Sequence, residues 1–97
     1  MKINRTTNGS ALTLAVEGRL DTTTAPELER EIKTLDGVDA LTMDFAGLDY
    51  ISSAGLRVLL SAHKQMSKKG GMKVVNVNEL VMEVFEVTGF SDIQTIE

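Results

Sequence analysis

The chain has 97 residues, of which 42% are hydrophobic and 25% are charged, and its formal net charge is −4. This length predicts a single domain spanning residues 1–97. The absence of cysteine excludes disulfides, thiolate metal sites and cysteine nucleophiles, and the acidic balance argues against a nucleic-acid partner. No apolar run is long enough to cross a bilayer and no signal peptide is visible, so we expect no membrane partner and a cytoplasmic location.

The N-terminal residues predict a β-hairpin followed by a loop. Residues 2–7 and 11–17 alternate as strands on either side of Asn8-Gly9, a dipeptide that accepts the positive dihedral angles of a tight turn. Residues 18–23 are expected to form a loop that leads away from the hairpin.

A helix is predicted after this loop. The segment from Thr24 to Glu27 has the form of a capping box, with proline in the first turn where its missing N–H costs nothing. The Asp36-Gly37 pair would end the helix. Its buried stripe is expected to comprise Leu28, Ile32 and Leu35.

The centre of the chain is typical of a strand, a loop and a second helix. Residues 40–45 alternate as a strand, and Gly47 interrupts it. Helical spacing of apolar residues then predicts a helix from Ser53 to Lys69, closed by Gly70-Gly71. One of two adjacent serines, Ser52 or Ser53, should cap it, and the spacing does not decide which. Because the first amides of a helix lack partners, a phosphorylated serine would fit there.

The last third predicts a strand, a helix and a short strand. Residues 72–77 are rich in valine, and residues 78–88 follow as a helix. Gly89 suits the left-handed position after that helix, and Phe90 would reach back onto Phe85. Residues 93–96 would form the last strand. The inward positions of the helix are expected to be Leu80, Val81, Val84 and Phe85.

Helices that alternate with strands require crossover connections, which pair strands in parallel, whereas the first two strands can pair as a hairpin. The sequence therefore predicts an α/β fold with a small mixed sheet packed with helices.

No catalytic, metal or cofactor site is predicted. The single histidine, His63, falls on the apolar side of the central helix and has no carboxylates at ligand spacing, so we expect a partly buried structural role. The segment around Ser53 does not match a nucleophile elbow, and Gly70-Gly71 precedes a strand rather than a helix, the reverse of a phosphate-binding loop. Spacing does not separate a functional Ser53 from a plain helix cap, and without further information the plain cap is the favoured explanation.

A family resemblance adds to this interpretation. The segment from Asp44 through Ser52-Ser53-Ala54-Gly55-Leu56 to Leu60 resembles the signature of the STAS domain, the fold of bacterial anti-sigma factor antagonists. The match extends in order through Glu17-Gly18-Arg19-Leu20-Asp21 upstream and Val87-Thr88-Gly89-Phe90 downstream. Many members have one more helix after the last strand, and the family position before the serine, often aspartate, is Ser52 here.

The resemblance implies that an anti-sigma factor serine kinase phosphorylates Ser53. It also implies a partner-binding surface around this serine, comprising Asp21, Thr22, Ser52, Ser53, Ala54, Gly55 and Arg57. The unmodified protein would bind the kinase and release the sigma factor, and a PP2C-like phosphatase would reset the switch. ATP and magnesium would belong to the kinase, so no cofactor is expected here.

Two other functions remain open. One is a STAS module of a lipid-transport or sensory complex in which the serine is never modified. The other is a small enzyme or ligand-binding α/β domain, which an apolar cavity with convergent polar groups would favour.

Overall fold

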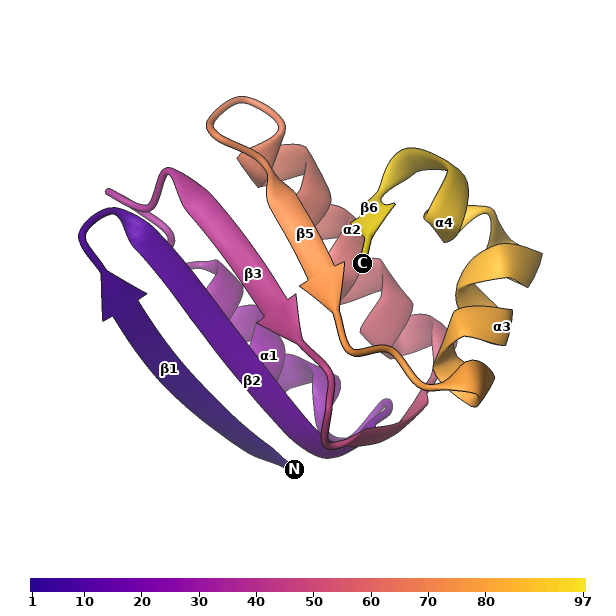
Figure 1. The fold of residues 1–97 in the computed structure, drawn as a ribbon. Helices are drawn as coiled ribbons and strands as arrows, with labels where there is room; N and C mark the ends of the chain where they lie inside the picture. Colours follow the sequence, from indigo (N-terminus) through magenta and orange to yellow (C-terminus); the bar gives the residue numbers. More distant parts are fainter.

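The computed structural model describes all residues from Met1 to Glu97 and shows a mixed β-sheet with helices α1 and α2 behind it and helices α3 and α4 beside its β5–β6 edge (Figure 1). The strand order is β1-β2-β3-β5-β6, and β4 pairs with the far end of β2. Only β1 and β2 are antiparallel, so the predicted hairpin followed by parallel crossovers is confirmed. The elements are β1 (Lys2–Asn8), β2 (Ala11–Leu20), α1 (Ala25–Ile32), β3 (Ala40–Asp44), β4 (Leu48–Ile51), α2 (Ser53–Met66), β5 (Met72–Val75), α3 (Glu79–Thr88), α4 (Phe90–Ile93) and β6 (Thr95–Ile96).

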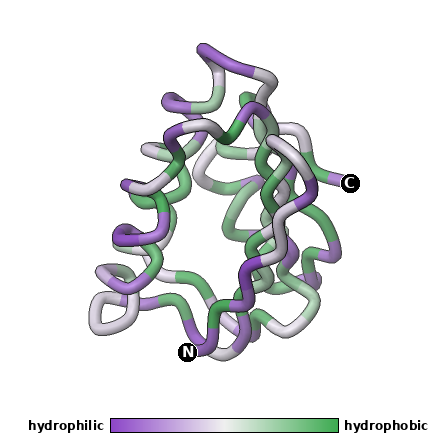
Figure 2. Tube along the Cα trace, turned by 90° about the vertical axis from the view of Figure 1, so that its left-hand side faces the viewer, coloured by the Kyte–Doolittle hydropathy of each residue, from purple (hydrophilic) through white to green (hydrophobic).

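The hydrophobic core lies between the sheet and the helices. Alternate residues of β2 are buried, and the parallel register sets Leu12 beside Leu41 and Leu14 beside Met43. The predicted inner stripe of α1, with Leu28 and Ile32, packs onto this surface. Figure 2 shows helical turns on the left facing the strands on the right. The fold is therefore a two-layer α/β arrangement, in which the alternate buried residues of the strands pack against the buried stripes of the helices.

The strand β4 was not predicted, and it changes the shape of the sheet. The sequence placed residues 18–23 in a loop, but β2 continues to Leu20. Gly18 adopts a φ of 94°, the ladder shifts register there, and the Gly18 N–H donates to the Gly47 carbonyl at 2.9 Å. Because glycine accepts this dihedral angle without a Cβ clash, β2 bends from β3 towards β4.

The predicted capping box at the start of α1 is wrong. Thr24 precedes the helix with helical dihedral angles, φ −103° and ψ −20°, and its side chain makes no cap bond to the helix. Its hydroxyl instead donates to the Arg19 carbonyl at 2.7 Å and accepts from the Asp21 N–H at 2.8 Å. The Asp21 carbonyl takes over part of the cap by accepting from the Ala25 N–H at 2.7 Å.

Two helices end earlier than predicted. Helix α1 stops at Ile32 rather than at Asp36-Gly37, although Leu35 beyond it is still buried. Helix α2 stops at Met66 rather than at Lys69, because the Lys69 and Gly71 N–H groups both donate to the Met66 carbonyl and the regular i→i−4 pattern ends there. None of the helices has both the length and the apolar character that crossing a bilayer requires.

The C-terminal segment follows the prediction in part. Gly89 has a left-handed φ of 81°, and the Phe85 and Phe90 rings lie 4.9 Å apart, as expected. Residues from Phe90 to Ile93 form the short helix α4, so the last strand begins at Thr95 rather than at residue 93. Leu80 was predicted to face inward but is 52% exposed, because only the side of α3 that carries Val81 and Phe85 meets the core.

Candidate functional site

Strand β4 delivers the chain to the two serines at the start of α2, and only one of them caps the helix. Ser52 has extended dihedral angles, and its hydroxyl oxygen accepts from the Gly55 N–H at 3.3 Å. Its own N–H donates to the Leu20 carbonyl at 2.9 Å. Ser53 is the first helical residue; it is exposed and its hydroxyl makes no hydrogen bond within the chain. The sequence left the cap open between the two, and the structure assigns it to Ser52.

Gly55 fixes the distance between α2 and the strands beneath it. A Cβ atom on this residue would lie 2.6 Å from Leu20 Cγ and 3.0 Å from the Leu20 carbonyl oxygen. Only glycine permits so close an approach, because any larger residue would push the helix away from β2. Gly55 is itself buried, so its place in the predicted site is one of packing.

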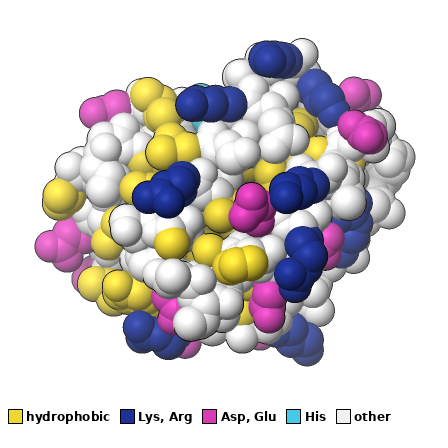
Figure 3. Space-filling view, turned by 180° about the vertical axis from the view of Figure 1, so that it is seen from behind, with side chains coloured by type: hydrophobic (Ala, Val, Ile, Leu, Met, Phe, Trp, Pro, Cys, Tyr) yellow, Lys and Arg dark blue, Asp and Glu magenta, His cyan; other side chains and the backbone are white.

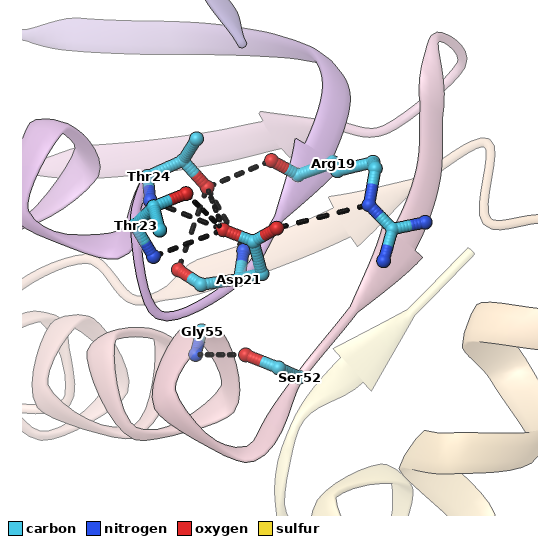
Figure 4. Close-up of polar contacts among 6 residues, drawn as sticks. All are labelled: Arg19, Asp21, Thr23, Thr24, Ser52 and Gly55. Atoms are coloured by element: carbon cyan, nitrogen blue, oxygen red, sulfur yellow. Dashed lines mark hydrogen bonds and ion pairs between the residues drawn. The ribbon is translucent and has the colours of Figure 1, made fainter.

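Asp21 organises the loop between β2 and α1 (Figure 4). Its Oδ1 atom accepts from the Thr23 hydroxyl at 2.7 Å, from the Thr23 N–H at 3.0 Å and from the Thr24 N–H at 3.2 Å. The Thr23 hydroxyl bond is the largest influence in lowering the pKa of the Asp21 carboxyl below its usual value; partial burial opposes it, and the backbone N–H groups act with it. The carboxylate is therefore ionised at neutral pH, with one oxygen committed to the loop.

Arg19 is a residue that the sequence did not single out for a role. Its Nε atom lies 3.7 Å from Asp21 Oδ2, and its guanidinium lies 4.3 Å above the centre of the Tyr50 ring. Arg19 on β2 and Tyr50 on β4 are paired in the sheet. Because strand β4 was not predicted, the sequence did not indicate that these two side chains lie together. The Arg19 side chain is 62% exposed and presents a positive charge beside Asp21.

A shallow groove brings three of the predicted site residues together. Its volume is ≈ 270 Å³, and it runs between the start of α1 and the first turns of α2. Thr22, Ala54 and Arg57 line it, and Glu29 of α1 adds a carboxylate. Arg57 has no ion-pair partner within the chain, whereas Glu29 lies 3.9 Å from Lys33. The remaining lining residues are Ala25, Pro26, Val58 and Ser61.

His63 is placed away from this region. It is half-buried, and its Nδ1 atom lies 2.8 Å from Gln94 Oε1. Since ten residues of helix separate it from Ser53, an axial rise of about 15 Å keeps the two side chains apart. The predicted partly buried position of His63 is confirmed.

The electrostatics at the start of α2 favour a negative group. The first turn contains no acidic residue, and its N–H groups point towards the exposed end where Ser53 lies. The free N–H groups and the helix dipole together give this end a partial positive charge.

A family model described as the STAS domain matches residues 2–97. Among similar proteins, BtrV of Bordetella bronchiseptica, which carries the name of anti-sigma factor antagonist, is 34% identical over 96 residues, covering 96% of this chain and 83% of that protein. The anti-sigma-B factor antagonist of Bacillus subtilis is 30% identical over 89 residues, covering 89% of this chain and 81% of that protein.

Solved structures agree on the fold. An anti-sigma factor antagonist from Mycobacterium paratuberculosis superposes with a TM-score of 0.89 at 24% identity, covering 98% of this chain and 83% of that one. The Bacillus protein SpoIIAA in its phosphorylated form superposes with a TM-score of 0.77 at 16% identity, covering 99% of this chain and 91% of that one.

Proposed function

Because the chain belongs to the STAS domain family, we propose that it is an anti-sigma factor antagonist whose binding is switched at Ser53. In the unmodified state it binds an anti-sigma factor that is a serine kinase, and so releases the sigma factor. The kinase then transfers phosphate from ATP to the Ser53 hydroxyl, and the complex separates. A PP2C-like phosphatase restores the serine. The protein acts in the cytoplasm as a binding module and needs no cofactor of its own.

The observation that carries this proposal is that one serine caps α2 and the other makes no hydrogen bond within the chain. Since Ser52 caps α2, the Ser53 hydroxyl is not needed to stabilise the helix, and it is exposed to an approaching kinase. Modification there costs the fold no hydrogen bond. The names of the relatives support the same role, and SpoIIAA, which shares the fold, has been solved in a phosphorylated form.

Local charge explains how phosphate would end the binding. A phosphoserine carries roughly −1.5 to −2 charges at neutral pH. Within the free protein this charge meets the partially positive helix end, so it is tolerated. In a complex the same charge would have to lose its water, and a carboxylate on the partner would repel it. The switch is therefore expected to act at the interface and to leave the fold unchanged.

The groove between α1 and α2 extends the proposed partner surface. Thr22, Ala54 and Arg57 line it close to Ser53 in the chain, and the buried Gly55 holds α2 close to the strand end at Leu20. Asp21 contributes by fixing the loop that carries Thr22. In this proposal Ser52, Ser53, Thr22 and Arg57 meet the partner, and Asp21 and Gly55 place them.

The decisive experiment combines phosphorylation with binding. The protein is incubated with its anti-sigma factor kinase and ATP, and mass spectrometry is expected to locate one phosphate on Ser53, both in the wild type and in Ser52→Ala. Ser53→Ala should remain unmodified and bind the kinase, whereas Ser53→Asp should lose binding in titration calorimetry while staying folded. Phosphate on Ser52 or on residues 22–24, or tight kinase binding by Ser53→Asp, would contradict the proposal.

A further inference from the structure

Helix α3 carries apolar residues both on its buried side and on the neighbouring exposed surface. Val81 and Phe85 are buried, as described above. Leu80, Val84 and Val87 lie beside these buried residues and form what we call the outer stripe of α3; Val84 is half-buried and also packs against the core. Leu80 is 52% and Val87 82% exposed. With Glu83 and Thr88, these residues line a shallow groove of ≈ 330 Å³ on the surface.

The spacing of the outer stripe is that of a helix-docking surface. Its three apolar residues stand at positions i, i+4 and i+7, so they form one continuous row along the helix. Single exposed apolar residues are common on protein surfaces and need no explanation. A row of them beside a groove is the arrangement that receives the apolar face of another helix.

The charged side chains of the segment that carries the outer stripe are all negative. The last 20 residues, from Asn78 to Glu97, contain no lysine, arginine or histidine. Residues 1–77 hold ten basic and nine acidic side chains, so the C-terminal segment accounts for more than the whole net charge of −4. Figure 3 shows hydrophobic and acidic side chains at the left edge of the molecule, the edge that α3 forms. The acidic residues of the segment are Glu79, Glu83, Glu86, Asp92 and Glu97.

The three glutamates of α3 have no ion-pair partner within the chain. The four ion pairs of the protein involve other carboxylates, on α1, at Asp21 and at Glu97. Their charges are therefore available to a binding partner. A second copy of this chain would bring like charges together across the same stripe, which disfavours self-association. Anionic lipids and nucleic acids would be repelled for the same reason.

We propose that the outer stripe of α3 binds an amphipathic helix of another protein, with leucine-like residues on one face and lysine or arginine along one flank. Leu80, Val84 and Val87 would receive the apolar face, and Glu79, Glu83 and Glu86, which lie together on one side of the stripe, would pair with the basic flank. This is an interaction surface additional to the one at Ser53.

The two surfaces are structurally separate. Helix α3 packs against β4 through Asn78, whose side-chain amide donates to the Leu48 carbonyl at 2.8 Å. No residue of α3 lines the groove between α1 and α2. Binding at the outer stripe is therefore expected to be the same in the wild type and in Ser53→Asp, which separates this proposal from the proposed function.

Two synthetic peptides test the proposal. Both are helical and share one leucine face, but one has a lysine flank and the other a glutamate flank. Fluorescence anisotropy with the full chain should show saturable binding of the lysine peptide, at least about tenfold tighter than that of the glutamate peptide. Val87→Asp and Glu83→Lys should each weaken binding by about tenfold. Both positions are exposed, so circular dichroism should show an unchanged fold.

Asp36→Lys is the matched control, because it makes the same charge reversal at an exposed turn away from α3 and should leave binding nearly unchanged. Equal binding of the two peptides, or an equal loss for Asp36→Lys and Glu83→Lys, would overturn the proposal. Sedimentation equilibrium gives a further check: a dimer of the free chain that Val87→Asp dissociates would identify a second copy as the occupant and would also overturn it.

Discussion

Replacing Ser52 and Ser53 by alanine, one at a time, should distinguish the serine that caps α2 from the serine that we propose is phosphorylated, because only the first replacement should lower the stability of the fold. Ser52→Ala removes the hydroxyl that accepts from the Gly55 N–H, so one amide in the first turn of α2 loses its partner. Loss of such a cap costs about 0.5–2 kcal/mol. The observed distance of 3.3 Å lies at the long end for this kind of bond, so the cost is expected in the lower half, about 0.5–1 kcal/mol.

Ser53→Ala should behave differently. The Ser53 hydroxyl has no hydrogen-bond partner, so its removal leaves no group unsatisfied and the change in stability should stay within about 0.5 kcal/mol. Thermal unfolding followed by circular dichroism can resolve the two variants, because a domain of this size shifts its Tm by about 4–8 °C per kcal/mol. Ser52→Ala should therefore melt about 2–8 °C below the wild type.

The matched control is Ser52→Asn, which retains a side-chain oxygen able to cap the helix and should recover most of the lost stability. If Ser53→Ala melts as low as Ser52→Ala, or lower, then the Ser53 oxygen supports the helix. In that case the assignment of Ser53 as the free hydroxyl would be refuted.

Two further predictions concern the residues that hold the site in place. Because hydrogen bonds lower the pKa of Asp21, its bonds to the loop should be complete above the unfolded carboxyl value near 3.9 and be lost as the pH falls through the lower folded value. NMR shifts of the Thr23 and Thr24 amides should report this titration, and Asp21→Asn, which cannot ionise, should abolish it; amides that titrate equally in Asp21→Asn would contradict the assignment. Gly55→Ala should destabilise the domain by about 1–3 kcal/mol, because its Cβ would meet Leu20 at 2.6 Å. Urea denaturation measures this cost, and a variant as stable as the wild type would show that α2 can shift freely on β2.

Periodicity was sufficient to predict the main elements, because each depends on a local pattern that the core then buries. The alternation of Leu12, Leu14 and Val16 and the helical row of Leu28 and Ile32 follow this rule. Strand β4 does not, because four residues form it by pairing with the end of β2 about thirty residues earlier. A single sequence contains no local signal for that long-range pairing.

The sequence was sufficient to predict the region of the candidate site, but not which of its two serines caps α2. The resemblance gave the region, and the structure brings Thr22, Ala54 and Arg57 into one groove. Which serine caps α2 depends on whether the first helical dihedral angles begin at residue 52 or 53, and spacing cannot fix this. The failed capping box at Thr24 has the same origin, since its hydroxyl is drawn to the Arg19 carbonyl across the loop.

The anchoring of Ser52 to Leu20, together with the close packing of Gly55, has a consequence for the timing of the proposed switch. These contacts hold the start of α2 in place, so the proposed switch requires no change of backbone conformation. The off state would then be stored in a covalent phosphoester bond, and thermal fluctuation on the microsecond to second scale could not erase it. The lifetime of the phosphorylated state would then be set by the rate at which the phosphatase removes the phosphate, and not by a property of the chain itself.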